Sequence, residues 1–128
     1  MEIRSRAAWP EDVDLSARPG MEGLHVWRLL SGDKVGSRQL IFDVVDIEPG
    51  AVHTLHRHPN AEQATYLLSG SGFHLTEDGR FPMSAGDVVF IPAGEWHGFA
   101  NEGEETVTIL GLWGGVGSTE EAGYEDRP

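Results

Sequence analysis

The sequence predicts an all-β protein, a single domain built as a sandwich or barrel of short antiparallel strands. Runs rich in β-branched and aromatic residues alternate with turns rich in glycine, proline, aspartate and asparagine. The 17 glycines and 7 prolines break the chain more often than a helical protein tolerates. Short strands with frequent turns and few helical periods are typical of β-sandwiches and β-barrels.

The expected strands follow one another through the middle of the chain. They cover residues 24–30, 38–47, 51–58, 63–69, 72–76, 80–83, 87–91, 96–100 and 105–113. Several breaks between them are explicit turn signals. Glu48-Pro49-Gly50 separates two strands, Asp78-Gly79 suits a tight hairpin, and Pro92-Ala93-Gly94 suits a sharp corner.

The length of 128 residues fits one domain, which we expect to span residues 1–128. Its barrel core is predicted at about residues 21–115. Residues 1–20 form an irregular N-terminal arm that can supply an edge strand or a dimer contact. Residues 116–128 are polar and acidic, which predicts a solvated tail without a function.

The charge balance excludes several classes of partner. With 9 basic and 21 acidic residues the net charge is −12, so phosphate backbones and anionic lipid surfaces are repelled. We therefore expect no nucleic-acid partner and no membrane association. No apolar run approaches the ~20 residues of a membrane span, and the polar N-terminus does not resemble a signal peptide, so a cytoplasmic location is expected. The absence of cysteine excludes disulfides, thiolate metal sites and a cysteine nucleophile.

Three histidines form a pattern that suits a metal ion. His56 and His58 are two residues apart on an expected strand, so both side chains point to the same face. Two imidazoles placed in this way can converge on one divalent ion. His97 follows the Pro92–Gly94 corner and can reach the same point from another strand. Taken alone, a His-x-His pair is a weak signal, because exposed or packing histidines explain most such pairs.

Two stretches around these histidines resemble the two motifs of the cupin family. Residues 50–70, GAVHTLHRHPNAEQATYLLSG, have the glycine, the His-x-His pair after five intervening residues and the closing glycine of the first motif. Residues 86–101, GDVVFIPAGEWHGFAN, are similar to the second motif at every defining position. The resemblance implies a double-stranded β-helix, a jelly-roll-like barrel, with His56, His58 and His97 as metal ligands inside it. It also implies a homodimer.

One position departs from the commoner form of the first motif. Counting back from Gly70 and counting on from His58 both place Gln63, not a carboxylate, at the fourth ligand position. Glu62 immediately precedes it and is the alternative ligand. Adjacent strand residues face opposite ways, so both cannot fill the same inward slot without a bulge. The two spacings favour Gln63, and some cupins are similar in using glutamine here.

Alternation along the strands assigns the remaining side chains. The side chains expected to share the ligands' face and line the pocket are Thr54, Thr65, Leu67 and Phe99. His53 is an odd number of residues from His56, so we expect it to face away from the interior. His25 and His74 have no partner in either motif and are expected to be surface or packing residues. No catalytic acid or base identifies itself.

The donor set indicates a function. A metal ion with three or four protein ligands keeps positions for water or substrate, and four neutral ligands leave its charge uncompensated. We therefore expect one divalent ion per chain (Fe, Mn, Co, Ni or Zn) and an enzyme acting on a small polar or anionic metabolite by Lewis-acid chemistry, of isomerase, lyase, dehydratase or cyclase type. The alternatives are an Fe(II)-dependent dioxygenase with the same ligands and a non-catalytic cupin that binds or senses a small ligand.

The expected strand over residues 38–47 is apolar on both faces. One face carries Leu40, Phe42 and Val44, and the other carries Ile41, Val45 and Ile47. A strand that is apolar on both faces is usually covered on both, which supports the expected homodimer.

Overall fold

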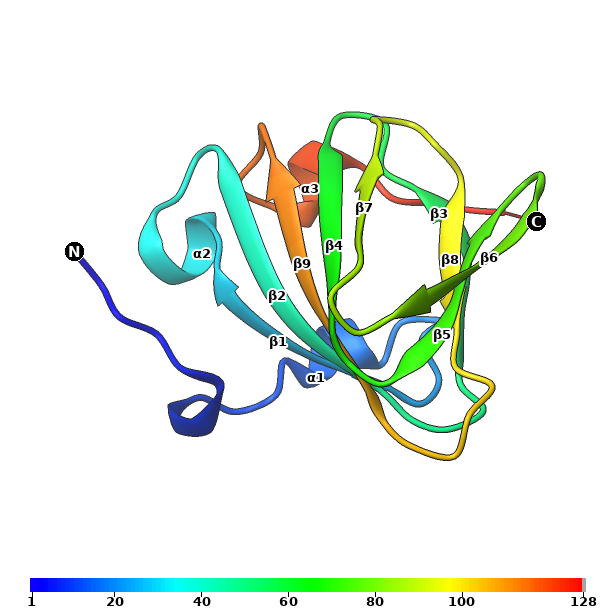
Figure 1. Ribbon diagram of the computed structural model, residues 1–128. Coiled ribbons are helices and arrows are strands. Elements are labelled where there is room, and N and C mark those ends of the chain that lie inside the picture. The colour runs from blue at the N-terminus through cyan, green and yellow to red at the C-terminus, as the bar shows by residue number, and fades with distance from the viewer. Residues whose placement is uncertain (128) are drawn as a thin grey trace.

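The computed structural model describes residues 1–127 and consists of two five-stranded antiparallel sheets that curve around a common interior (Figure 1). The first sheet has the order β1 (Leu24–Leu30), β2 (Leu40–Ile47), β9 (Val107–Gly114), β4 (Glu62–Ser69) and β7 (Val88–Ile91). The second sheet has the order β10 (Glu125–Asp126), β3 (Val52–Arg57), β8 (His97–Ala100), β5 (Ser71–Thr76) and β6 (Gly79–Ser84).

The chain passes back and forth between the two sheets, as a double-stranded β-helix requires. From β2 to β5 each strand lies in the sheet opposite to its predecessor, and the same is true from β6 to β9. Within residues 1–127, helical structure is limited to single turns: η1 (Arg6–Ala8), α1 (Val13–Ser16), α2 (Gly32–Val35) and α3 (Thr119–Ala122). The predicted all-β, jelly-roll-like barrel is confirmed. No helix among the described residues is long and apolar enough to cross a membrane.

The inner face of the first sheet carries three cross-strand rows of side chains that set the character of the interior. The row at the closed end is apolar: Val26, Val45, Ile109 and Leu67. The middle row is mixed: Arg28, Asp43, Gly111, Thr65 and Val89. The third row is Ile41, Trp113, Gln63 and Ile91. Apolar residues therefore fill one end of the barrel, while polar side chains lie toward the other end.

Asn101, the last residue of the second motif, has a structural role. Its side chain is fully buried, and its Nδ2 donates to the carbonyl oxygens of Ile47 at 2.9 Å and Glu105 at 2.8 Å. Its Oδ1 accepts from the backbone N–H of Gly103 at 3.0 Å. One amide thus satisfies backbone groups at the end of β2 and in the loop between β8 and β9, which fixes the closed end of the barrel.

The C-terminal segment corrects one expectation. The composition of residues 116–128 predicts a solvated tail, yet Val116 and Ala122 are buried against Ile41 and Trp113, and β10 pairs with β3. Pro128 lies outside the described residues. The acidic composition misleads here because the apolar residues of the segment face the barrel while Glu120 and Glu121 face the solvent. The segment is therefore part of the barrel wall.

Candidate metal centre

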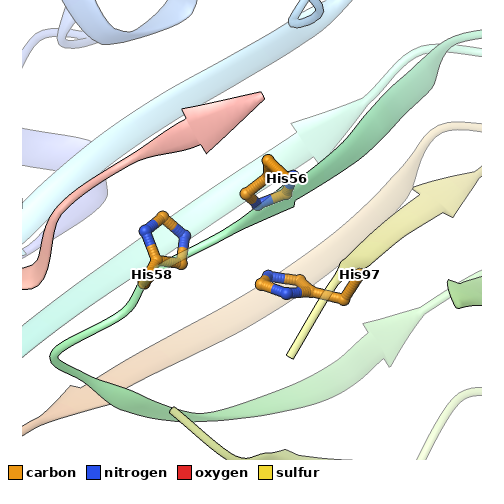
Figure 2. A group of neighbouring side chains, drawn as sticks. All are labelled: His56, His58 and His97. Carbon is orange, nitrogen blue, oxygen red and sulfur yellow. The ribbon is translucent and has the colours of Figure 1, made fainter. Parts of the chain in front are cut away.

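Three histidines meet at the open end of the barrel. His56 comes from β3, His58 from the turn that follows β3, and His97 from the first position of β8. All three are buried, and their ligand-capable nitrogen atoms lie within 4.8 Å of one another. Figure 2 shows the three rings turned toward a common space. This separation suits three nitrogens that share one metal ion.

The backbone fixes the orientation of each ring. Nδ1 of His56 lies 2.8 Å from the carbonyl oxygen of Thr54, Nδ1 of His58 2.9 Å from that of Gly123, and Nδ1 of His97 2.9 Å from that of Glu95. Since a carbonyl oxygen only accepts, each Nδ1 carries the proton and donates it. The other nitrogen of each neutral ring, Nε2, is then left with a free lone pair, the form that binds a metal.

Gln63 lies on the inner face of β4, in the row that faces the histidines. Its side chain is buried and lines the same cavity, and its Oε1 has no hydrogen-bond partner among the described residues. An unpartnered buried amide oxygen costs about 1–3 kcal/mol, which a ligand bond would recover. Glu62 is exposed on the outer face, and β4 has no bulge between the two residues. Three imidazole nitrogens and one amide oxygen fit a divalent first-row metal ion.

His53 does not face away, and that prediction was wrong. Its ring stacks on His56 with centroids 3.9 Å apart, and its Nε2 lies 3.3 Å from the hydroxyl of Tyr124. The cause is a bulge: between His53 and His56 strand β3 advances three residues while its partner β8 advances two. The extra residue reverses the alternation, so both histidines reach the interior. A side chain at Gly98 would collide with the carbonyl oxygen of His53, so glycine permits this close pairing.

The two remaining histidines differ in position. His74, on β5, is buried and lines the cavity, with its ring parallel to that of His97 at 6.3 Å. It therefore packs against the site rather than lying on the surface. His25 lies apart from the cavity, in ion pairs with Glu11 and Glu48.

The four expected pocket residues separate into two pairs. Thr65 and Phe99 line the cavity. Thr54 is exposed instead, because it lies within the bulged part of β3. Leu67 is fully buried in the apolar core and does not line the cavity, although Val26, Val45 and Ile109 of the same row do. Strand alternation thus predicted the correct face of the sheet for Leu67, but it did not predict which side chains of that face line the cavity.

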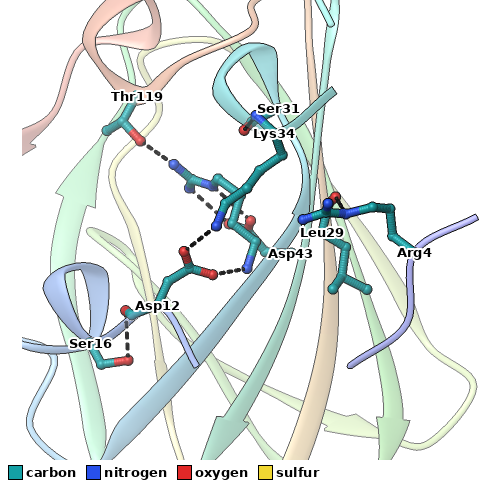
Figure 3. Close-up of polar contacts among 9 residues, drawn as sticks. Arg4, Asp12, Ser16, Leu29, Ser31, Lys34, Asp43 and Thr119 are labelled. Atoms are coloured by element: carbon teal, nitrogen blue, oxygen red, sulfur yellow. Dashed lines mark hydrogen bonds and ion pairs between the residues drawn. The ribbon is translucent and has the colours of Figure 1, made fainter. Parts of the chain in front are cut away.

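The cavity beside the histidines has a volume of about 120 Å³ and contains an ion pair that the sequence analysis missed. Arg28 donates from Nε to Oδ1 of Asp43 at 2.8 Å and from Nη2 to Oδ2 at 2.9 Å, and its Nη1 donates to Thr119. Figure 3 labels the two acceptor residues, Asp43 and Thr119. Burial raises the pKa of Asp43 above its ordinary value, and the Arg28 guanidinium opposes this rise. The sequence signal that could have revealed this ion pair is Asp43, a carboxylate among the inward-facing apolar positions of residues 41–47.

Tyr124 covers the histidines from the C-terminal segment. Its ring is parallel to that of His56, with centroids 5.2 Å apart, and the guanidinium of Arg18 lies 5.0 Å from its centre. Burial raises the pKa of its hydroxyl to about 12, so the phenol is neutral at physiological pH. The C-terminal segment therefore supplies the Gly123 carbonyl that orients His58 and the Tyr124 ring that covers His56.

The histidines are neutral at physiological pH. Burial lowers the pKa of His56 and of His58 to about 4, and burial with the nearby His56 lowers the pKa of His97 to about 3. Lone pairs for a metal ion are therefore available well below pH 7 without the loss of a proton.

This predicts that Zn²⁺ binding at pH 6 releases close to no protons from the three rings. With ordinary histidine pKa values near 6.5, binding at this pH would release about two protons. Isothermal titration calorimetry at pH 6, in buffers of different ionisation enthalpy, measures the number of protons released per Zn²⁺ ion bound. The surface variant His25→Ala should give the same number as the unmodified chain, and a release of two or more protons would contradict the buried, neutral site.

Comparison with known proteins agrees with this architecture. The family model described as "Cupin domain" matches residues 43–113. An oxalate-binding protein of Thermotoga maritima is 29% identical over 112 residues, which cover 88% of this chain and 92% of that protein. The polyketide cyclase RemF from Streptomyces resistomycificus superposes with a TM-score of 0.82 at 21% identity, covering 98% of this chain and 84% of the cyclase. A sugar phosphate isomerase from Silicibacter pomeroyi gives a TM-score of 0.66 at 28% identity, covering 88% and 69%. Since the family match spans more than half of the chain and includes both histidine motif regions, this protein belongs to the cupin family.

Proposed function

We propose that this cupin is a metal-dependent enzyme that converts a small polar or anionic metabolite by Lewis-acid chemistry, of isomerase, lyase or cyclase type. The observation that carries the proposal is the neutral donor set. His56, His58 and His97 offer uncharged nitrogens, and the fourth group facing them is the unpartnered amide oxygen of Gln63. One divalent ion (Fe, Mn, Co, Ni or Zn) held by these residues would supply an almost uncompensated positive charge that polarises a substrate oxygen.

The residues of the chain prepare the site for this role. Three backbone carbonyls hold the imidazoles in the tautomer and orientation needed. The rings of His53 and Tyr124 pack on His56, and that of Trp113 packs on His58, which contributes to the burial of both histidines. Electrostatic interactions are stronger in such a low-dielectric site than in water. The charge that the neutral donors leave uncompensated would therefore interact strongly with a substrate oxygen.

The size of the cavity and the relatives support a small substrate. A volume of about 120 Å³ compares with about 150 Å³ for an engineered cavity that binds benzene. The relatives compared above are named as an oxalate-binding protein, a polyketide cyclase and a sugar phosphate isomerase. All three names refer to small molecules that carry carboxylate, carbonyl or hydroxyl oxygens.

The reaction type is tested by metal analysis combined with oxygen uptake. The protein is analysed as purified, then loaded separately with Fe²⁺, Mn²⁺, Co²⁺, Ni²⁺ and Zn²⁺ and incubated with a panel of hydroxy acids and keto acids. We expect product formation without oxygen consumption, supported by a redox-inert ion such as Zn²⁺. Oxygen uptake that requires Fe²⁺ would instead establish the dioxygenase alternative. Binding of an acid without any turnover would establish a ligand-binding protein.

The fourth ligand is tested by two neighbouring substitutions. Gln63→Glu should bind Zn²⁺ at least tenfold more tightly, because it adds a negative charge among the ligands, and a unit charge at 4 Å interacts by about 4 kcal/mol at an effective dielectric of 20. For the same reason it should weaken the binding of an anionic ligand at least tenfold. Glu62→Gln should change neither affinity, since this carboxylate is exposed on the outer face of β4.

His97→Ala serves as the loss-of-site reference in the same titrations and should lower Zn²⁺ affinity by more than a hundredfold. A large loss of Zn²⁺ affinity confined to Glu62→Gln would mean that the neutral donor set is incorrect. The preference for Lewis-acid chemistry would then lose its basis.

We further propose that the protein is a homodimer that pairs through the outer face of the first sheet. This face carries two apolar rows: Trp27, Val44, Leu110, Tyr66 and Val88, and beside them Phe42, Leu112, Ala64 and Phe90. Val88 is 63% exposed and Phe90 61%. Among the described residues, the carboxylates at outward positions of these strands are Asp46, which pairs with Arg6, and Glu62; the two lie at opposite ends of the face. In a chain of net charge −12, this face is where a second copy can approach without repulsion.

Light scattering tests the dimer. The unmodified chain should have twice the monomer mass of 14.0 kDa at micromolar concentration, and Phe90→Glu should be monomeric because it buries a charge in the interface. Phe81→Glu is the matched control, an exposed phenylalanine on β6 of the other sheet, and should stay dimeric. A mass near 14.0 kDa for the unmodified chain would contradict the dimer.

A further inference from the structure

The cavity has polar groups at two levels. Gln63 and Trp113 share the row that faces the histidines, and two residues further along the same strands lie Thr65 and Gly111 of the middle row. Strand geometry separates adjacent inward rows by about 7 Å. Asp43 continues the middle row beside Gly111. A molecule that extends into the cavity from the histidine end would therefore meet the middle row first, before the apolar row of Val26, Val45 and Ile109 that also lines the cavity.

Asp43 has acceptor capacity that the protein does not use. It is 5% exposed and is the single carboxylate among the described residues that line the cavity. Each of its oxygens accepts one hydrogen bond from Arg28, and no other described residue donates to it. A carboxylate offers about four lone-pair sites, so about two remain for a ligand. Because a buried charge is stabilised by further hydrogen bonds, Asp43 favours a ligand that donates one.

Gly111 keeps the space in front of Asp43 open. A Cβ atom at this position would lie 3.9 Å from Cβ of Asp43 and 4.0 Å from Nε1 of Trp113, which are ordinary contact distances. Its φ angle is not positive, so the backbone does not require glycine. The fold therefore tolerates alanine here, and the effect of glycine is to leave volume beside the carboxylate.

We infer that Asp43 and Gly111 form a subsite for a hydroxyl group of the substrate, and that the substrate is a hydroxylated acid or carbonyl compound about the size of one six-membered ring. The inference rests on the proposed function, which directs the carboxylate or carbonyl of the substrate to the histidines. Arg28 holds the Asp43 carboxylate in place, and Asp43 accepts the hydrogen bond of the substrate hydroxyl. Gly111 leaves room for the carbon that carries this hydroxyl.

Isothermal titration of the Zn²⁺-loaded protein with benzoate, 3-hydroxybenzoate and 4-hydroxybenzoate tests the subsite. At least one hydroxybenzoate should bind tenfold or more tightly than benzoate. Asp43→Asn should reduce this preference to less than threefold, since an amide oxygen accepts more weakly, yet it can still accept from Arg28. Zn²⁺ affinity, measured separately, should be unchanged in this variant.

Gly111→Ala keeps the ion pair and provides a second variant. It should weaken hydroxybenzoate binding at least tenfold, while the unfolding temperature and the Zn²⁺ affinity stay as in the unmodified chain. Gly114→Ala is its matched control. Gly114 lies on the opposite face of the same strand, where an added Cβ would have the same clearance of 3.9 Å from Glu62. This control should leave every probe affinity unchanged. If Asp43→Asn does not fold, Gly111→Ala decides the question.

The outcomes separate the two proposals. Equal affinities for all three acids, or a hydroxyl preference that persists in Asp43→Asn, would overturn the subsite and leave the metal site intact. Failure of the Zn²⁺-loaded protein to bind any of the acids would overturn the single-ring substrate class. Failure of the unmodified chain to bind any divalent metal ion would overturn the proposed function itself, and the inference that rests on it.

Discussion

The site depends on three hydrogen bonds from histidine Nδ1 atoms to backbone carbonyl oxygens. Because Thr54, Gly123 and Glu95 contribute main-chain atoms, the direction of each free Nε2 lone pair is set by the path of the chain. Burial then keeps the rings neutral, since protonation inside the barrel carries a cost of about 1.4 kcal/mol per unit of lowered pKa. The folded barrel therefore presents three uncharged donors to one point before any ligand arrives.

These three carbonyls come from separate features of the fold, and each feature has a second function. The bulge in β3 orients His56 and also turns His53 inward. The corner before β8 starts the strand that carries His97. The C-terminal segment orients His58 and places Tyr124 over His56. The pairing of β10 with β3 holds this segment at the histidine end of the barrel, so residues 116–127 belong to the site as much as to the fold.

The sequence was informative wherever local spacing decides the structure. The two motifs predicted the barrel and the meeting of His56, His58 and His97, because their glycines and prolines fix where strands reverse. Alternation correctly placed Gln63 inside and Glu62 outside, since β4 is regular there. It failed for His53 because a bulge depends on pairing with β8, which no residue type in β3 signals. Arg28 and Asp43 were missed because their strands become neighbours only in the fold. The burial of apolar residues in the acidic C-terminal segment was also missed, because their contacts with the barrel form only in the fold.

The charges inside the cavity contrast with those of the rest of the molecule. The chain has a net charge of −12, yet a single carboxylate, Asp43, is found among the described residues that line the cavity, and Arg28 neutralises it. The wall also carries the guanidinium of Arg18. The acidic surface slows the approach of an anion, whereas the interior does not repel one that enters. Any affinity for an anionic ligand would therefore arise inside the barrel, from the donor set and the few polar groups of the wall. A change of one unit of charge there would outweigh many changes on the surface.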